Sequence, residues 1–227
     1  MSEFISRIIC LANSRKMSGR CLAGIEWKHD KVGSWIRPVS DRPNAEISME
    51  DRRYENGVDP QLLDIIDIPM QKRVPHNHQS ENCLINAQFY WTKVGTFDRS
   101  SLDKLVSPVE PLWLNGHSSS NGRNDQVPED RLDDIRDSLV LIEVPNVIYN
   151  VYAPGATFNN PKRRVQCRFT HCNETYELWV TDPQIEHQYL AMHNGTYKSG
   201  SSYLTISLGE PYEGFAYKLV AGVIGGD

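Results

Sequence analysis

Apolar residues gather in three short segments at the start of the chain, at residues 8–12, 21–27 and 34–40. Each segment has the length of a β-strand and is rich in aliphatic or aromatic residues, and polar residues separate the three. The connector at residues 13–20 is polar and basic. The pattern predicts a curled β-meander that carries this connector at its rim, where small β-barrels commonly bind ligands.

Segments with the same strand character recur along the rest of the chain. Pro69 is predicted to end the first of them, because proline lacks the backbone N–H that a sheet ladder needs. From residue 139 onwards the strand pattern restarts after a polar stretch. The predicted strands lie at residues 62–68, 83–85, 89–94, 139–144, 147–153, 165–169, 175–181, 203–208 and 217–224.

Short helices are predicted between these strands. The longest begins at Asp182, which can cap it with Pro183 in the first turn, and Asn194 follows its end. The predicted helices lie at residues 49–53, 100–106, 129–137 and 184–193. Residues 115–128 carry almost no apolar side chain, so we predict a mobile loop there. Closely spaced strands with isolated helices are typical of small barrels, so the predicted fold is mainly β with a few short helices.

The length of the chain predicts two small domains, and the distribution of charge identifies one basic region. The 227 residues are enough for two barrels of about five strands each, with a boundary near residues 110–138. The net charge is −5, yet between Arg7 and Arg42 eight lysines and arginines face three acidic residues. An acidic chain is unsuited to coating nucleic acid indiscriminately, but phosphates respond to the local field. The sequence therefore indicates a local binding surface.

No catalytic or metal-binding signature stands out in the chain. The sequence lacks the phosphate-binding loop, the serine-hydrolase elbow and the zinc-protease motif. Cysteine and histidine residues gather at residues 76–83 and 167–172, but neither group has the spacing of a structural zinc site. We therefore expect no metal and no cofactor, and the balance favours a protein that is not an enzyme.

The chain carries no feature that predicts export or membrane insertion. No apolar run approaches the roughly 20 residues that cross a bilayer, and residues 1–4 lack the basic start of a signal peptide. The five cysteines are an odd number and are scattered, as expected for buried thiols in a reducing compartment. We therefore expect a cytoplasmic protein without a membrane partner.

Several segments of the chain resemble the dual-OB (DuOB) domain proteins of bacteria. The opening segments that carry the resemblance are Cys10-Leu-Ala-Asn-Ser-Arg-Lys16, Gly19-Arg-Cys-Leu-Ala-Gly24 and Gly33-Ser-Trp-Ile-Arg-Pro-Val-Ser40. The later segments are His76-Asn-His-Gln-Ser-Glu-Asn82, Ser207-Leu-Gly-Glu-Pro211 and Tyr217-Lys-Leu-Val220. The resemblance covers nearly the whole chain. It implies two small OB-like β-barrels in tandem. Together with the strand pattern, it leads us to expect the first barrel at residues 1–110, a linker loop and short helix at residues 111–138, and the second barrel at residues 139–227.

The resemblance also implies a biological setting and a class of ligand. Such domains are associated with prokaryotic conflict, or anti-phage, systems, where the module is proposed to sense nucleic acid or nucleotides. We therefore expect a non-enzymatic recognition module for nucleic acid, preferably single-stranded, or for a nucleotide, acting as a sensor or accessory component of a bacterial defence system. One alternative is a protein-binding adaptor subunit of an effector complex. Another is a hydrolase or nuclease that uses His76, His78 and Glu81.

The basic connector and the strands beside it form the first candidate site. An OB barrel binds single strands with cations for the phosphates and aromatic rings for the bases. Strand alternation places Trp35 and Arg37 on one face, where a ring beside a guanidinium would make a stacking platform. Alternatively, Trp35 belongs to the core and the basic residues are ordinary surface charges. The residues predicted to bind here are Arg15, Lys16, Arg20, Trp35 and Arg37.

Two further polar segments are candidate sites. Residues 76–82 are wholly polar, and their Asn, Gln and His side chains are suited to reading base edges; alternatively, they form a loop that bonds to neighbouring backbone. The basic residues 162–164 would extend a nucleic-acid track onto the second barrel; alternatively, they are a solvated strand end. The residues predicted to bind are His76, Asn77, His78, Asn82, Lys162, Arg163 and Arg164.

Overall fold

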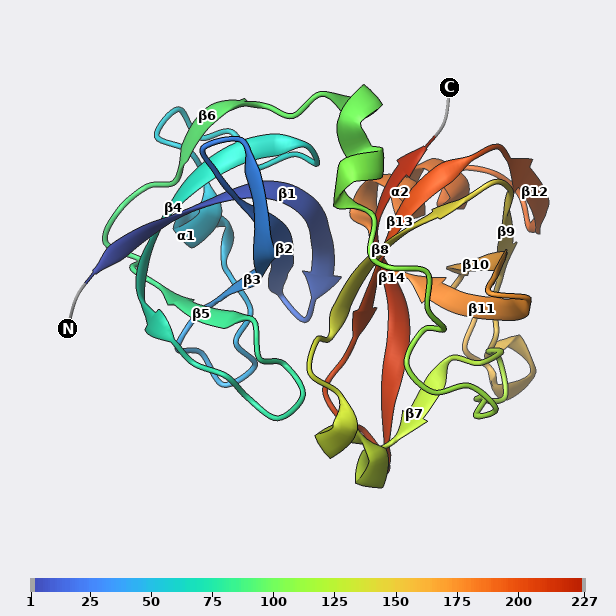
Figure 1. Ribbon diagram of the computed structural model, residues 1–227. Coiled ribbons are helices and arrows are strands. Elements are labelled where there is room, and N and C mark those ends of the chain that lie inside the picture. Colours follow the sequence, from blue (N-terminus) through green and yellow to red (C-terminus); the bar gives the residue numbers. More distant parts are fainter. Residues whose placement is uncertain (1–2, 226–227) are drawn as a thin grey trace. The chain divides into compact units, whose positions relative to one another are not determined.

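A computed structural model describes residues 3–225, which form two compact units (Figure 1). The first unit is Met1–Leu105 with Arg136–Ser138, and the second is Val106–Ile135 with Leu139–Asp227. Each unit is built around a multi-stranded β-sheet, and short helical segments connect some of the strands. The prediction of a mainly β fold with a few short helices is confirmed.

The first unit forms a closed β-barrel. Its elements are β1 (Phe4–Lys16), β2 (Gly19–Lys28), β3 (Lys31–Val39), α1 (Met49–Arg52), β4 (Asp64–Arg73), β5 (Asn82–Ile85), β6 (Thr92–Thr96) and a 3₁₀ turn at Arg99–Leu105. The hydrogen-bonded order is β1-β2-β3-β5-β4, with β6 beyond β4, and β4 pairs back with β1. The strands β3 and β5 run parallel, and α1 lies between β3 and β4 in the chain. This is the path of a five-stranded OB barrel.

The long strand β1 closes this barrel by serving two neighbours. Its first half pairs with β4 and its second half with β2. The register with β2 shifts between Cys10 and Ala12, which marks a bulge that bends the strand. At Gly24 of β2, a Cβ atom would lie 2.1 Å from the carbonyl oxygen of Ile9. Only glycine fits this close approach of the two backbones.

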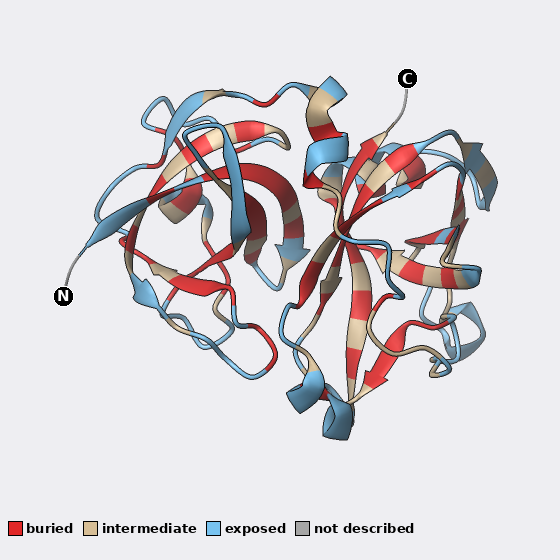
Figure 2. Cartoon of the chain, in the orientation of Figure 1, coloured by how far each residue is buried: buried red, intermediate tan, exposed pale blue. Residues whose placement is uncertain are grey.

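One face of each strand fills the barrel interior. Along β4, buried and half-buried residues alternate, as expected for a strand with one face on the core. Figure 2 shows the same alternation of red and tan along several strands. The buried side chains of this core include Ile8, Cys10, Leu22, Ile36, Ile66, Ile68, Met70 and Trp91.

Pro69 lies inside β4, which corrects the prediction that it ends the strand. Its carbonyl oxygen accepts a hydrogen bond of 2.8 Å from the backbone N–H of Asn86. Because the nitrogen and oxygen of one strand residue point to the same side, the proline nitrogen faces the point where β4 changes partner from β6 to β5. No ladder donor is needed at that point, so the strand tolerates proline there.

The second unit contains more strands than the first. They are β7 (Gln126–Pro128), β8 (Leu139–Val144), β9 (Val147–Tyr152), β10 (Arg164–His171), β11 (Glu174–Val180), β12 (Gly195–Ser199), β13 (Ser202–Leu208) and β14 (Phe215–Gly225). Its helical segments are α2 (Pro183–Leu190) and 3₁₀ turns at Glu129–Asp134 and Ala156–Phe158. The sequence did not predict β7 or β12.

The second unit repeats the barrel path of the first with one strand broken in two. The order is β9-β10-β11-β14-β13-β8, with β12 beyond β9 and β7 on β14. Pro145 and Asn146 separate β8 from β9; β8 pairs with β13, and β9 pairs with β10. Together these two strands take the place of β1: β8 pairs as the first half of β1 does, and β9 pairs as its second half does. The strands β11 and β14 run parallel, as β3 and β5 do, and α2 follows the third strand of the path.

Helix α2 begins where predicted and ends earlier. The Asp182 carboxylate accepts hydrogen bonds from the backbone N–H of Gln184 and Ile185 at 2.9 and 3.4 Å, and Pro183 stands in the first turn. The helix ends at Leu190 rather than at residue 193. None of the helices within residues 3–225 has both the length and the apolar content needed to cross a membrane.

Residues 115–128, predicted to be a mobile loop, are tied down by polar contacts. Ser119 donates its backbone N–H and its hydroxyl to the Asp125 carboxylate, at 2.8 and 2.6 Å. The buried Lys218 ammonium donates to the carbonyl oxygen of Asn124 at 2.7 Å. Hydrogen bonds to buried groups thus replace the apolar contacts that this segment lacks, and the prediction overlooked them.

Candidate nucleic-acid interface

The loops that flank the ligand face of an OB barrel follow its first and fourth strands. In the first unit these are the turn at Met17 and Ser18, between β1 and β2, and residues 74–81, between β4 and β5. The basic connector and the polar segment singled out in the sequence therefore occupy the two loops of the barrel path that border β2 and β3. The two segments are far apart in sequence, so only the topology relates them.

The β1–β2 hairpin carries three basic residues at its tip. The strand register places Arg15 directly opposite Arg20, and Lys16 opposite Gly19. Arg15 is exposed, whereas Lys16 and Arg20 are half-buried. The hairpin therefore gathers three basic side chains at one turn.

The exposed platform that Trp35 and Arg37 were predicted to form is absent because Arg37 is buried, which corrects the sequence analysis. Trp35 is half-buried opposite Ile25 of β2, whereas Arg37 is 3% exposed. Every residue from 36 to 39 is buried. The face that alternation assigned to solvent is covered at Arg37 by the segment 136–138, which no sequence pattern placed there.

Arg37 belongs to a buried ionic group that we call the Arg37–Glu81–Ser138 cluster. The Nη2 atom of Arg37 lies 3.0 Å from Glu81 Oε1 and donates to Ser138 Oγ at 2.8 Å. The Ser138 hydroxyl donates to the same Glu81 oxygen. The Arg37 and Glu81 side chains are 3% and 2% exposed. Arg37 therefore joins β3, the β4–β5 loop and Arg136–Ser138, rather than facing a ligand.

The polar segment at residues 76–82 divides into an exposed tip and a buried base. His76 and Asn77 are exposed, and two backbone hydrogen bonds of 2.9 and 3.2 Å between His76 and Gln79 close the tip. His78 and Asn82 are 3% and 4% exposed. Neither is placed to meet a ligand at the surface, which corrects the prediction for these two residues. Burial of His78 likewise gives no support to the hydrolase alternative.

The three basic residues at the start of β10 have three different environments. Arg163 is half-buried and donates to the carbonyl oxygen of Leu190 at 3.0 Å, so it is engaged with the end of α2. Arg164 lies over the ring of Trp179, with Cζ 4.0 Å from the ring centroid. Lys162 is exposed. The prediction of one uniform basic track is therefore corrected for Arg163.

Tyr152 and Trp179 lie beside Arg164 and were missed in the sequence. Their ring centroids are 5.7 Å apart at an interplanar angle of 34°. The available signal was strand alternation, because Leu178 and Val180 are buried and thereby assign Trp179 to the outer face of β11.

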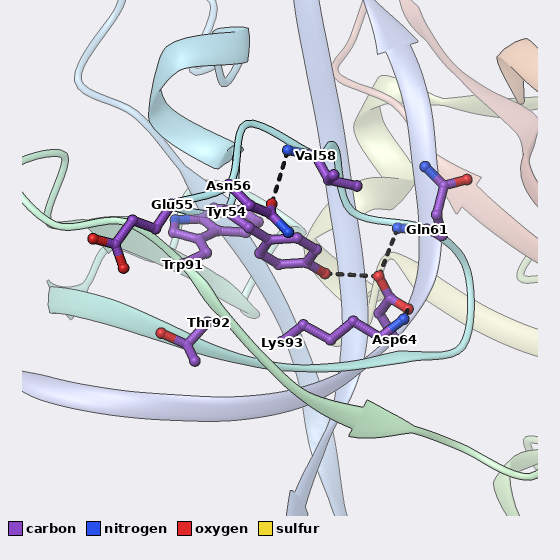
Figure 3. Close-up of a pocket in the computed structure, with 9 residues that line it drawn as sticks. All are labelled: Tyr54, Glu55, Asn56, Val58, Gln61, Asp64, Trp91, Thr92 and Lys93. Atoms are coloured by element: carbon purple, nitrogen blue, oxygen red, sulfur yellow. Dashed lines mark hydrogen bonds and ion pairs between the residues drawn. The ribbon is translucent and has the colours of Figure 1, made fainter.

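The first unit contains a pocket of about 650 Å³, and Figure 3 shows the residues that line it. Its lining residues are Tyr54, Glu55, Asn56, Val58, Gln61, Asp64, Trp91, Thr92 and Lys93. The Asp64 carboxylate accepts from the Tyr54 hydroxyl at 2.7 Å and from the Gln61 backbone N–H at 3.0 Å. Lys93 Nζ lies 2.5 Å from its other oxygen. Burial, together with this hydrogen bond to Asp64, raises the pKa of Tyr54 above its ordinary value of 10.0.

A carboxylate engaged in this way anchors the surrounding loop. The Asp64→Asn variant is expected to lower the free energy of unfolding of the first unit by about 2–3 kcal/mol, because the amide cannot balance the Lys93 charge. Denaturant unfolding followed by circular dichroism measures this change. Asp67→Asn, which weakens the more exposed pair with Arg7, is the control and should cost below about 1 kcal/mol. Equal losses in both variants would contradict the anchoring role.

Residues 3–225 contain no group of three or more His, Cys, Asp or Glu residues that could hold a metal ion.

The barrel path of both units agrees with the comparison of the chain with known proteins. No curated protein and no solved structure matches this sequence. The family model of the dual OB-containing domain matches residues 6–223, nearly the whole chain. The resemblance seen in the sequence is therefore confirmed, and so is the expectation of two OB-like barrels. The chain belongs to the family of proteins with a dual OB-containing domain.

Proposed function

We propose that this protein is a non-enzymatic recognition module whose first barrel binds single-stranded nucleic acid or a nucleotide. The observation that carries the proposal is the tip of the β1–β2 hairpin, where Arg15 and Arg20 face each other beside Lys16. These three basic residues stand at one turn of a chain whose net charge is −5. Phosphate groups bind where lysine and arginine side chains gather, and their binding releases counterions.

Other groups near the same loops suit the remaining parts of the ligand. Trp35 on β3 is half-buried, and an indole ring offers a stacking surface for a base. His76 and Asn77 at the exposed tip of the β4–β5 loop present donors and acceptors for base edges. We place this binding activity in a sensor or accessory component of a bacterial defence system, as the family resemblance implies.

The triple variant Arg15→Glu, Lys16→Glu and Arg20→Glu tests the proposal. It is expected to weaken the binding of single-stranded DNA or RNA of about 20 nucleotides by about 100-fold or more, because three phosphate contacts become repulsive. The slope of log affinity against log salt should become shallower by about 2. Fluorescence anisotropy over a series of salt concentrations measures both quantities.

A matched control separates the hairpin from the overall charge. Lys104→Glu, Arg131→Glu and Lys198→Glu change the net charge equally at exposed positions outside the hairpin. This variant should bind nearly as the wild type does, and circular dichroism should show that both triple variants are folded. Equal weakening by the two variants would overturn the proposal. A wild-type protein that binds a partner protein but no oligonucleotide at any salt concentration would also overturn it.

A further inference from the structure

The outer face of the second barrel carries three stacked side chains, which we call the Tyr152–Arg164–Trp179 stack. Arg164 Cζ lies 4.0 Å from the Trp179 ring centroid, and the Trp179 and Tyr152 centroids are 5.7 Å apart. The strand register sets Arg164 of β10 directly opposite Tyr152 of β9. All three residues are half-buried, so part of each side chain meets solvent.

The core of the barrel does not account for this stack. Alternation along β11 buries Leu178 and Val180 and leaves Trp179 on the opposite face. A guanidinium that covers an indole at an exposed site stabilises a fold only slightly, so it does not explain why a large ring is held outside the core. The stack is therefore better explained by a partner on the outer face.

The start of β10 is held in place next to the stack. The Arg163 guanidinium donates to the carbonyl oxygen of Leu190 at 3.0 Å, to that of Met192 at 2.5 Å and to Asn194 Oδ1 at 2.7 Å. Because Arg164 follows directly in the chain, its backbone position is fixed. A stacking surface fixed in this way loses little conformational entropy on binding.

Positive charge flanks the stack along the same strand. Lys162 precedes it and is exposed. Arg168 lies on the same face of β10 by alternation, and its side chain is 49% exposed, with its Nε atom 3.6 Å from Glu177 Oε1. Single-stranded nucleic acid binds where aromatic rings stack on its bases and cations lie near its phosphates, and Lys162 and Arg168 are cations just before and on the strand that carries Arg164.

We propose that the Tyr152–Arg164–Trp179 stack binds an unpaired base of single-stranded nucleic acid, with Lys162 and Arg168 beside its phosphates. In the second unit, β9, β10 and β11 occupy the places of β1, β2 and β3 in the first, so the stack lies on the strands with which OB barrels bind ligands. The inference rests on the proposed function for its class of ligand. It concerns the other barrel, so the two are tested separately.

The test compares two probes of equal length and charge, a single-stranded DNA of about 20 nucleotides and its fully abasic counterpart. In the full chain, Trp179→Leu is expected to weaken binding of the base-bearing probe by at least about fivefold and to leave binding of the abasic probe unchanged. Arg164→Gln keeps both rings and should also weaken binding of the base-bearing probe, by a smaller factor. Tyr203→Leu, at an aromatic position on β13 outside the stack, is the matched control and should bind both probes as the wild type does.

The outcomes separate this inference from the proposed function. Unchanged binding in both Trp179→Leu and Arg164→Gln, with weak binding in the hairpin triple variant, overturns the inference alone. Weak binding of the base-bearing probe by Trp179→Leu, with wild-type binding by the hairpin triple variant, supports the inference and overturns the proposed role of the first barrel. Equal weakening of both probes by Trp179→Leu would mean that the ring does not stack on bases, and overturns the inference.

Discussion

Replacing Glu81 with glutamine is expected to lower the free energy of unfolding of the first unit by about 3–5 kcal/mol. Glutamine keeps the shape of the side chain but removes the charge that balances Arg37, which is 3% exposed and 3.0 Å from Glu81 Oε1. Water cannot replace the missing counter-charge at a buried site, so the whole penalty falls on the folded state. Denaturant unfolding followed by far-ultraviolet circular dichroism measures the change.

Two further variants make this measurement specific to the buried cluster. Glu26→Gln removes an exposed pair with Lys28, 2.7 Å long, and should cost below about 1 kcal/mol. The double variant Arg37→Met with Glu81→Leu removes both charges together and should recover much of the lost stability, because no buried charge is left unbalanced. If Glu81→Gln is no more destabilising than Glu26→Gln, the cluster does not hold the barrel together.

The sequence predicted most strands of the fold because the evidence for them is local. Alternating and β-branched segments, bounded by polar or turn residues, identify strands without knowledge of their partners. The helix that begins after Asp182 could also be predicted from local sequence, since its cap and first-turn proline are adjacent in the chain. Two barrels of about five strands then followed from the number of strands and the chain length.

Pairings between distant segments were not predictable in this way. Alternation assigned Arg37 to solvent, but Ser138, 101 positions later in the chain, covers it. Likewise β8 and β9 read as two independent strands, because nothing local shows that they close one barrel wall between them. In both cases the missing information is the identity of a partner far away in the chain, which a single sequence does not contain.

The candidate site shows the same division between local and long-range information. The basic hairpin tip was predictable because it depends only on a tight turn between two consecutive strands. Arg15 and Arg20 face each other across this turn. The segment at residues 76–82 was recognised as polar, but polarity alone does not separate its exposed tip from its buried base. Asn82 lies at the start of β5, opposite Arg37 in the parallel pairing, and this pairing buries it.

Lys218 leads to a second large expected effect, on the pH dependence of stability. Its ammonium group is buried and donates to the carbonyl oxygens of Leu114 and Asn124, each at 2.7 Å. Burial lowers the pKa of Lys218 from 10.5 to about 7, although the nearby Asp125 carboxylate opposes this shift. Between these two pH values the unfolded chain holds a proton on Lys218 that the folded chain has released.

The stability that depends on Lys218 should therefore increase as the pH rises from about 7 to about 10.5, and should be constant below about pH 7. Other groups titrate in the same range, so we compare the wild type with Lys218→Met, in which they are unchanged. The difference in free energy of unfolding between the two should shift in favour of the wild type by about 1.4 kcal/mol per pH unit over this window. Denaturant unfolding at pH 6, 7, 8, 9 and 10 measures this difference. A difference that stays flat over that range would mean that the lysine keeps its proton in the folded state, held by Asp125 and the two carbonyl oxygens.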